Sequence, residues 1–268
     1  MAKLFLCLCL FLAFLAPVHC LSLRAAASLE VGQQNYPQST QTLDELWQHY
    51  AVALQDAKVA LPSEISDDLT AITPDNEDLV WDDTGRVLMV TWTSYPGYDN
   101  QVGKETTIGR ETWVTAVPEL RNFCRDFHPT PEEPLTLRLE QLLGLPPMVG
   151  KTRFVEVWVE PEDIFRPTPD DQITDTVAQL TVPPRSAFDS EEDYEFARDW
   201  YNSQLAGQHY DDPAKGYPWT RLGYTYDWCN SDSEVGLSEF VIKAKSSAKV
   251  ERVSTTEDYC QVALSIRL

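Results

Sequence analysis

Apolar positions in this chain recur with both helical and strand-like periods, and segments of the two kinds follow one another irregularly. The first begins with Thr42-x-x-Glu45, a capping-box pattern, and continues with apolar residues at intervals of three and four. This combination predicts a helix over 42–58 that ends before Pro62 and could form an appendage to the rest of the fold.

Further helices and strands are predicted from the same two periods. Helices are expected over 118–127, 130–143 and 190–207, and strands over 86–95, 106–116, 153–160, 224–228, 240–244 and 260–268. The first two strands are expected to pair as an antiparallel hairpin. The helix over 190–207 places four residues on one face: Tyr194, Ala197, Tyr201 and Leu205. This mixed order favours an α+β fold with a mainly antiparallel sheet and several packed helices, in a single globular domain over 41–268.

The N-terminal residues have the pattern of a secretory signal. Lys3 is followed by the apolar run Leu4 to Ala16, which is shorter than the roughly 20 residues of a spanning helix. We therefore expect a signal peptide over 1–20, cleaved near Cys20, followed by a flexible leader over 21–40. The mature protein is expected to be secreted or periplasmic and to have no transmembrane segment.

Charge restricts the partners of the mature protein. The chain has a net charge of −21, and loss of residues 1–20 removes Lys3 and no acidic residue, which makes it −22. Such a charge argues against nucleic acid and against anionic membranes, because both bind through cationic side chains. A small molecule, a carbohydrate or another protein remains as a partner. The eight tryptophans all lie after residue 20 and provide material for a core.

Three cysteines remain after the signal, namely Cys124, Cys229 and Cys260, and they allow three different pairings. Cys124 lies on the apolar face of the helix predicted over 118–127. Cys260 begins the alternating apolar face of the strand predicted over 260–268. Because both side chains are expected to point into the core, we predict a disulfide between Cys124 and Cys260.

Motifs for catalysis and metal binding are weak. The chain has no Gly-x-Ser-x-Gly sequence, and the four-residue spacing of Cys124 and His128 fits a structural cysteine better than a nucleophile. Acidic and amide residues gather near Gly236, but their spacing does not match a calcium loop. No metal site and no cofactor are predicted. Asp227 and Glu239 flank a predicted hairpin, where opposed carboxylates near tryptophan would suit glycoside hydrolysis.

The block YPWTRLGYTYDW over 217–228 is the most distinctive segment. Its rings and charges could line a pocket in which a cation stacks on aromatic faces. The candidate ligand-binding residues are Trp219, Arg221, Tyr224, Tyr226, Asp227 and Trp228, with Glu239 from the return strand. The alternative is a core strand with a buried pair between Arg221 and Asp227, in which Gly223 is structural.

Several segments resemble a family of uncharacterised exported bacterial proteins, found notably in cyanobacteria. They are WVTAVPELRNFC (113–124), LRLEQLLGLPP (137–147), VEVWVEPEDIFRPTPD (155–170) and YPWTRLGYTYDWCN through GLSEFVI (217–242). The resemblance covers residues 80–260 and implies export, but no activity. Relatives have glycine at the position of Cys229 and extra cysteines near Thr168 and Val177, which implies that Cys229 stands outside the disulfide and that a second disulfide is absent.

Two functions follow as expectations. The first is a secreted binding or structural module without catalysis. The second is an exported hydrolase that uses carboxylates near the C-terminal aromatic hairpin. A cleft with facing carboxylates, at least one of them removed from water, would favour the enzyme.

Overall fold

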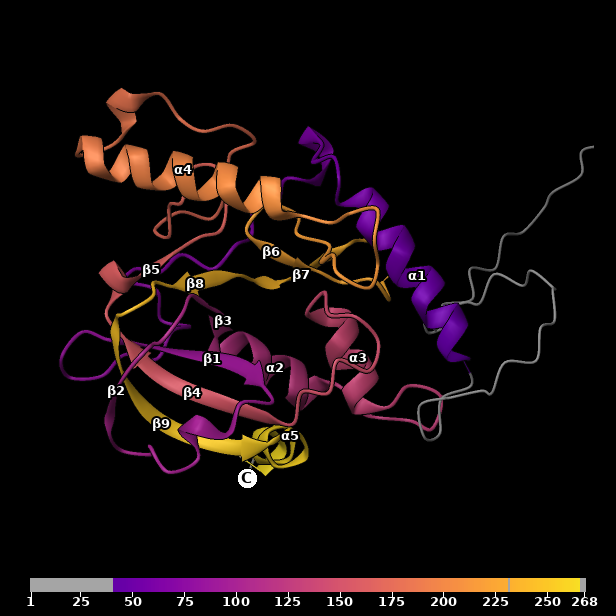
Figure 1. Cartoon of the computed structure of the whole chain (residues 1–268). Helices are drawn as coiled ribbons and strands as arrows, with labels where there is room; N and C mark the ends of the chain where they lie inside the picture. The colour runs from indigo at the N-terminus through magenta and orange to yellow at the C-terminus, as the bar shows by residue number, and fades with distance from the viewer. Residues whose placement is uncertain (1–40, 231, 266–268) are drawn as a thin grey trace, which may run out of the picture.

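The computed structural model describes residues 41–230 and 232–265 and has an α+β architecture (Figure 1). The predicted signal peptide and leader lie outside the described residues. Seven strands form one sheet in the order β2-β9-β4-β1-β3-β8-β5, and every neighbouring pair is antiparallel. The strands of this sheet are β1 (Val87–Thr93), β2 (Glu105–Thr107), β3 (Thr112–Ala116), β4 (Arg153–Val159), β5 (Ile164–Phe165), β8 (Phe240–Ile242) and β9 (Ser247–Thr255).

A second, two-stranded antiparallel sheet pairs β6 (Tyr224–Tyr226) with β7 (Val235–Ser238). The helices are α1 (Leu43–Asp56), α2 (Val117–Asp126), α3 (Leu135–Leu142), α4 (Glu191–Gly207) and α5 (Thr256–Ser265). Short 3₁₀ turns are η1 (Pro62–Glu64), η2 (Pro96–Tyr98), η3 (Pro161–Asp163) and η4 (Arg185–Ala187). Within the described ranges, no helix is long and apolar enough to cross a membrane.

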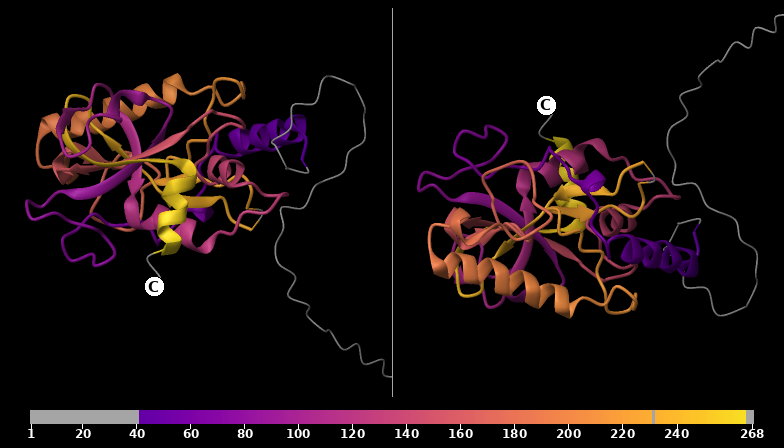
Figure 2. Two further views of the ribbon diagram at one scale, coloured as in Figure 1. Left: turned by 90° about the horizontal axis from the view of Figure 1, so that it is seen from below. Right: turned by 90° about the horizontal axis from the view of Figure 1, so that it is seen from above.

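The central strands of the large sheet are buried on both faces. Alternate residues of β1 and β4 enter two different cores: Met89 and Val157 belong to one, whereas Val90 and Phe154 belong to the other. Helices α2 and α5 lie side by side over the second core (Figure 2). Helix α4 lies on the other side of the molecule, where Trp200 contacts the ring of Phe165 in β5.

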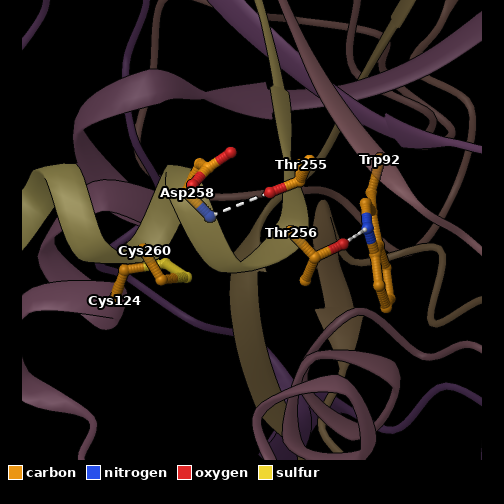
Figure 3. Close-up of a disulfide and its surroundings, with 6 residues drawn as sticks. All are labelled: Trp92, Cys124, Thr255, Thr256, Asp258 and Cys260. Atoms are coloured by element: carbon orange, nitrogen blue, oxygen red, sulfur yellow. Dashed lines mark hydrogen bonds between the residues drawn. A yellow bond between two sulfur atoms is a disulfide. The ribbon is translucent and has the colours of Figure 1, made fainter.

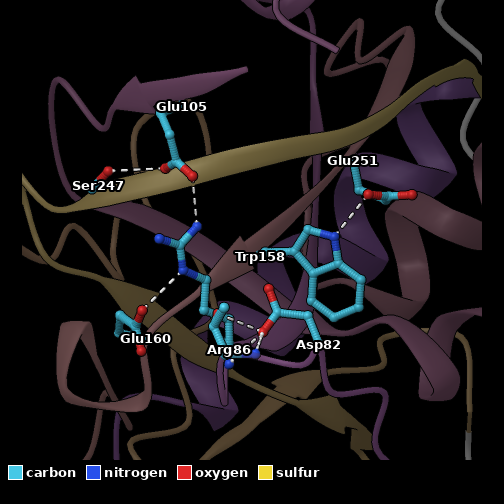
Figure 4. Close-up of polar contacts among 8 residues, drawn as sticks. Asp82, Arg86, Glu105, Trp158, Glu160, Ser247 and Glu251 are labelled. Carbon is cyan, nitrogen blue, oxygen red and sulfur yellow. Dashed lines mark hydrogen bonds and ion pairs between the residues drawn. The ribbon is translucent and has the colours of Figure 1, made fainter. Parts of the chain in front are cut away.

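A polar network joins four strands at one part of the sheet (Figure 4). Arg86, just before β1, contacts Glu105 of β2 at 2.8 Å and Glu160, just after β4, at 2.9 Å. The indole nitrogen of Trp158 in β4 donates to Glu251 of β9 at 2.7 Å. These contacts fasten the short edge strand β2 and the long strand β9 to the centre of the sheet.

The Cys124–Cys260 disulfide is confirmed, and it joins α2 to α5 (Figure 3). The strand predicted over 260–268 is wrong, because Thr256–Ser265 is helix α5; Ile266 and Leu268 lie outside the described residues. The backbone N–H of Asp258 donates to the Thr255 hydroxyl at 3.1 Å, which is a helix-start contact. The cysteine therefore points into the core from a helix rather than from a strand.

Three other predicted elements differ from the structure. The strand predicted over 106–116 is divided into β2, which pairs with β9, and β3, which pairs with β1 in the expected antiparallel direction. The helix predicted over 130–143 begins only at Leu135, because Pro131 and Pro134 restrict the preceding residues and Thr130 and Glu133 bond each other in a turn. The return strand expected at 240–244 is β8, which joins the large sheet, while β7 pairs with β6.

Helix α4 packs differently from the expected face. Ala197 is buried, whereas Leu205 is 37% exposed, and the contacts to β5 come from Phe196 and Trp200. Part of the predicted face is also used, because Ala197 is buried and the ring of Tyr201 packs against Trp219.

Candidate ligand-binding cleft

The residues predicted to form one pocket divide between the core and a surface cleft. Trp219 belongs to the core: it is 4% exposed, its indole nitrogen donates to the carbonyl of Pro167 at 2.9 Å, and it packs edge-on against Trp200 of α4. Tyr224 is also buried, and its hydroxyl donates to the Glu64 carbonyl at 2.8 Å. Neither ring is open to a ligand.

Arg221 has a structural contact in place of the expected ligand. Its guanidinium donates to the carbonyl of Ala57, just after α1, at 2.7 Å. Cations at this end of a helix interact favourably with its unsatisfied carbonyls. Arg221 also lies over the ring of Tyr210, 5.9 Å from its centre. The cation that stacks on an aromatic face is therefore supplied by the protein itself.

Asp227 is paired with an arginine, but the expected partner is wrong. Both carboxylate oxygens accept from Arg138 of α3, at 3.0 and 2.6 Å, and not from Arg221. Asp227 is 3% exposed and also accepts from the backbone N–H of Cys229 at 3.2 Å. This two-point ion pair fastens the hairpin to α3.

A surface cleft of about 370 Å³ lies between α1 and the β6–β7 hairpin, which are neighbours in Figure 1. The residues that line it include His49, Asp56, Tyr226, Trp228, Asp232 and Glu234. The hydroxyl of Tyr226 donates to Asp56 at 2.8 Å across the two walls. The indole nitrogen of Trp228 donates to the Leu145 carbonyl at 3.0 Å, which fixes its ring in the hairpin wall.

A smaller cavity shares Asp56, Tyr226 and Glu234 with the cleft and adds Glu64 and Tyr224. Its volume of about 10 Å³ is enough for roughly one water molecule. Burial and the neighbouring carboxylates of Glu234 and Asp56 raise the pKa of Glu64. The hydroxyl of Tyr224 also donates to Glu234 at 3.2 Å.

Among the acidic side chains that line the cleft and the smaller cavity, Asp227 is paired with Arg138, but others have no ion pair within the part of the chain that the structure describes. Asp56, Glu64 and Glu234 form no ion pair with any lysine or arginine in the described chain. Their negative charge is opposed locally by tyrosine hydroxyls, by the backbone N–H of Leu61, which donates to Glu64 at 2.8 Å, and by the electrostatic effect of Arg221 on Glu64. Residues 41–230 and 232–265 contain no group of three or more histidine, cysteine or acidic side chains that could hold a metal ion.

The sequence indicated the hairpin wall of the cleft but not the wall formed by α1. His49 and Asp56 come from α1 and Glu64 from η1, about 160 to 170 residues before their hairpin partners. In the sequence they are ordinary polar positions on or after an amphipathic helix. No local pattern distinguishes them from solvated surface residues.

Glu239 lines neither cavity, although the sequence grouped it with Asp227. It follows β7 directly, is partly buried, and its carboxylate has no hydrogen bond or ion pair with other described side chains. Burial raises the pKa of this carboxyl to about 8. A carboxylate pair of Asp227 and Glu239 is therefore not assembled at one surface opening.

The raised pKa of Glu239 predicts a pH-dependent effect of Glu239→Gln. In the unfolded chain this carboxyl titrates near pH 4.3, whereas in the folded protein it titrates near pH 8. Its contribution to stability is therefore fully present below about pH 4.3 and is lost progressively as the pH rises to about 8. We expect the substitution to raise the free energy of unfolding by on the order of 2 kcal/mol at pH 8.5 and to have little effect at pH 4.5. Urea unfolding at both pH values measures this, with exposed Glu77→Gln as control. Equal effects of Glu239→Gln at the two pH values would show the prediction to be wrong.

Comparison of this chain with protein-family models, with curated proteins and with solved structures gives no match.

Proposed function

We propose that this protein is an exported, non-catalytic binding protein whose cleft between α1 and the β6–β7 hairpin takes a ligand with amine or guanidinium groups. The carrying observation is the group of three carboxylates, Asp56, Glu64 and Glu234, that face the cleft and its inner cavity without a cationic partner among the described residues. A bound cation would supply the missing charge.

The aromatic residues of the hairpin wall support a cationic ligand. Both Tyr226 and Trp228 line the cleft, but Trp228 is only 7% exposed. Tyr226 is partly exposed, and a cation over such a ring gains about 0.5–2 kcal/mol. The Tyr226 hydroxyl also donates to the Asp56 carboxylate at 2.8 Å. The negative charge of Asp56 and the aromatic ring of Tyr226 therefore lie next to each other in the cleft. A net charge of −21 would in addition attract cations over longer distances.

The disulfide and the N-terminal pattern support export. Disulfides persist in oxidising compartments such as the periplasm and the extracellular space, and Cys124–Cys260 joins two helices of the core. The secretory pattern of residues 1–20 points to the same compartments.

A second candidate function, an exported glycoside hydrolase, is favoured by one observation. Glu64 has a raised pKa beside Glu234 and Asp56, and paired carboxylates with different pKa values are the general acid and base of such enzymes. The hydrolase would need Glu64 to reach a substrate through the cavity it shares with the cleft.

Calorimetry with spermidine as the probe tests the binding proposal. We expect the double substitution Asp56→Asn, Glu234→Gln to weaken binding at least tenfold, because two charge-assisted contacts are lost. Tyr226→Phe should weaken it less, since the ring stays and only the hydroxyl that orients Asp56 is removed. The matched control is Asp75→Asn, Glu77→Gln, which changes charge equally at two exposed positions.

Two outcomes would contradict the binding proposal. One is equal spermidine affinity of the cleft and control variants, and the other is saturable binding of neutral cellohexaose in place of spermidine. Turnover of an oligosaccharide that disappears in Glu64→Gln would establish the hydrolase instead.

A further inference from the structure

Two cationic side chains outside the cleft also have no partner. Neither the guanidinium of Arg110 nor the ammonium of Lys151 forms a hydrogen bond or ion pair within residues 41–230 and 232–265. Neighbouring cations are paired: Arg153, two residues after Lys151, binds Asp99, and Lys104 donates to the carbonyl of Asn100 at 2.9 Å.

The topology brings Arg110 and Lys151 to the same end of the sheet. Strand β3 runs antiparallel to β1, so Arg110, just before β3, approaches the segment after β1. Lys151 approaches the same segment from the other side, because the N–H of Thr152 donates to the Thr93 carbonyl at 3.2 Å. Arg110 is close enough to act electrostatically on both Lys151 and Tyr98.

Partial burial of Lys151 makes its unpaired charge unfavourable without a bound anion, while Arg110 is exposed. Lys151 is partly buried, and burial together with the charge of Arg110 lowers its pKa. An ammonium removed from water and placed near a second cation loses hydration and gains repulsion. An oxyanion between the two side chains would reverse both effects, and the planar fork of arginine matches a carboxylate.

Two tyrosines lie in the segment after β1 that Arg110 and Lys151 approach. The ring of Tyr95 is 55% exposed and lies directly against the backbone of Gly97, where a Cβ atom would come within 2.2 Å of it. The ring of Tyr98 packs edge-on against Tyr95, with centres 5.6 Å apart. Glycine at position 97 therefore allows Tyr95 to be held as a fixed apolar platform that remains open to solvent.

We propose that Tyr95, Arg110 and Lys151 form a second binding site, for a sugar acid whose carboxylate lies between the two cations and whose ring stacks on Tyr95. A polyanion such as nucleic acid would be repelled by the net negative charge of the protein. A short acidic saccharide carries few charges and combines the carboxylate with an apolar ring face. This site shares no residue with the cleft and does not depend on the function proposed for it.

Calorimetry of the purified protein with trigalacturonate as the probe tests the site. We expect Arg110→Gln, Lys151→Gln to weaken binding at least tenfold. Tyr95→Ala should weaken it severalfold through the loss of stacking. The matched control is Lys245→Gln, Lys249→Gln, which removes two other cationic charges and should leave the affinity unchanged.

Chemical modification of Lys151 tests the site without a measurement of affinity. Because its pKa is lowered, Lys151 should react faster with an amine-acylating reagent than Lys245, as measured by mass spectrometry. Trigalacturonate should protect Lys151 and leave Lys245 reactive. The proposal is overturned if the double variant binds trigalacturonate as well as the control does, if no binding occurs, if galactotriose binds equally, or if inorganic phosphate alone protects Lys151 equally.

Discussion

Replacing both Cys124 and Cys260 by alanine is expected to lower the free energy of unfolding by about 5 kcal/mol. The bridge spans 136 residues, so its removal releases a very long closed loop in the unfolded chain. Both cysteines are buried between α2 and α5, and alanine at the two positions adds a small loss of packing. Guanidinium unfolding of the oxidised protein and of the double variant measures the difference.

The control for this experiment is Cys229→Ala, which leaves the bridge intact and should change stability by less than about 1 kcal/mol. Reduction of the wild-type protein should reproduce most of the loss seen in the double variant. A change below about 1 kcal/mol in the double variant would mean that the bridge does not restrict the unfolded chain as its length implies.

Asp227→Ala is expected to lower the free energy of unfolding by about 3–5 kcal/mol. The substitution leaves the guanidinium of Arg138, whose side chain is only 15% exposed, without its two-point partner. It also removes the acceptor for the Cys229 backbone N–H. The hairpin should consequently separate from α3 earlier in unfolding than the large sheet does.

Two variants separate this effect from a general loss of charge. Asp212→Ala removes the carboxylate of an exposed pair with Lys215 and should cost at most about 1 kcal/mol. Replacing both members of the buried pair, by Arg138→Met and Asp227→Leu, should cost less than Asp227→Ala alone, because no buried charge is left behind. Equal losses in Asp227→Ala and Asp212→Ala would contradict the prediction.

Local signals in the sequence were sufficient for several elements. The capping box before α1 is confirmed, with the Glu45 N–H donating to the Thr42 hydroxyl at 3.3 Å. Ser190, at the start of the helix predicted over 190–207, caps α4, and Pro118 lies in the first turn of α2. These contacts join residues three or fewer positions apart, so they can form before the rest of the chain is in place.

The C-terminal segment shows where a local pattern misleads. The alternation after Cys260 predicts a strand, but the strand of this region is β9, just before it, and the segment itself is α5. Strand β9 pairs with β4 along its length and leaves no free edge of β4 for a further strand. A helix can instead cover the sheet face and place Tyr259 and Cys260 in the core.

In the candidate site, too, the local pattern predicted only part of the arrangement. The aromatic block indicated Tyr226, whose partly exposed side chain does line the cleft, but Trp219, Tyr224 and Trp228 of the same block are core residues. Alternation along a strand indicates that side chains share a face. It does not indicate whether another element covers that face.

By itself, the sequence determined the α+β class, most helices and the central strands, because apolar periodicity and end signals act over short distances. It also indicated the pairing of Cys124 with Cys260, although Cys260 reaches the core from a helix and not from the predicted strand. Tertiary structure alone decided which charges meet. Asp227 pairs with Arg138, 89 positions away, and Asp56 meets Tyr226 across 170 positions. Such contacts depend on how α1, α3 and the hairpin pack, and the spacing of residues along the chain carries no record of that packing.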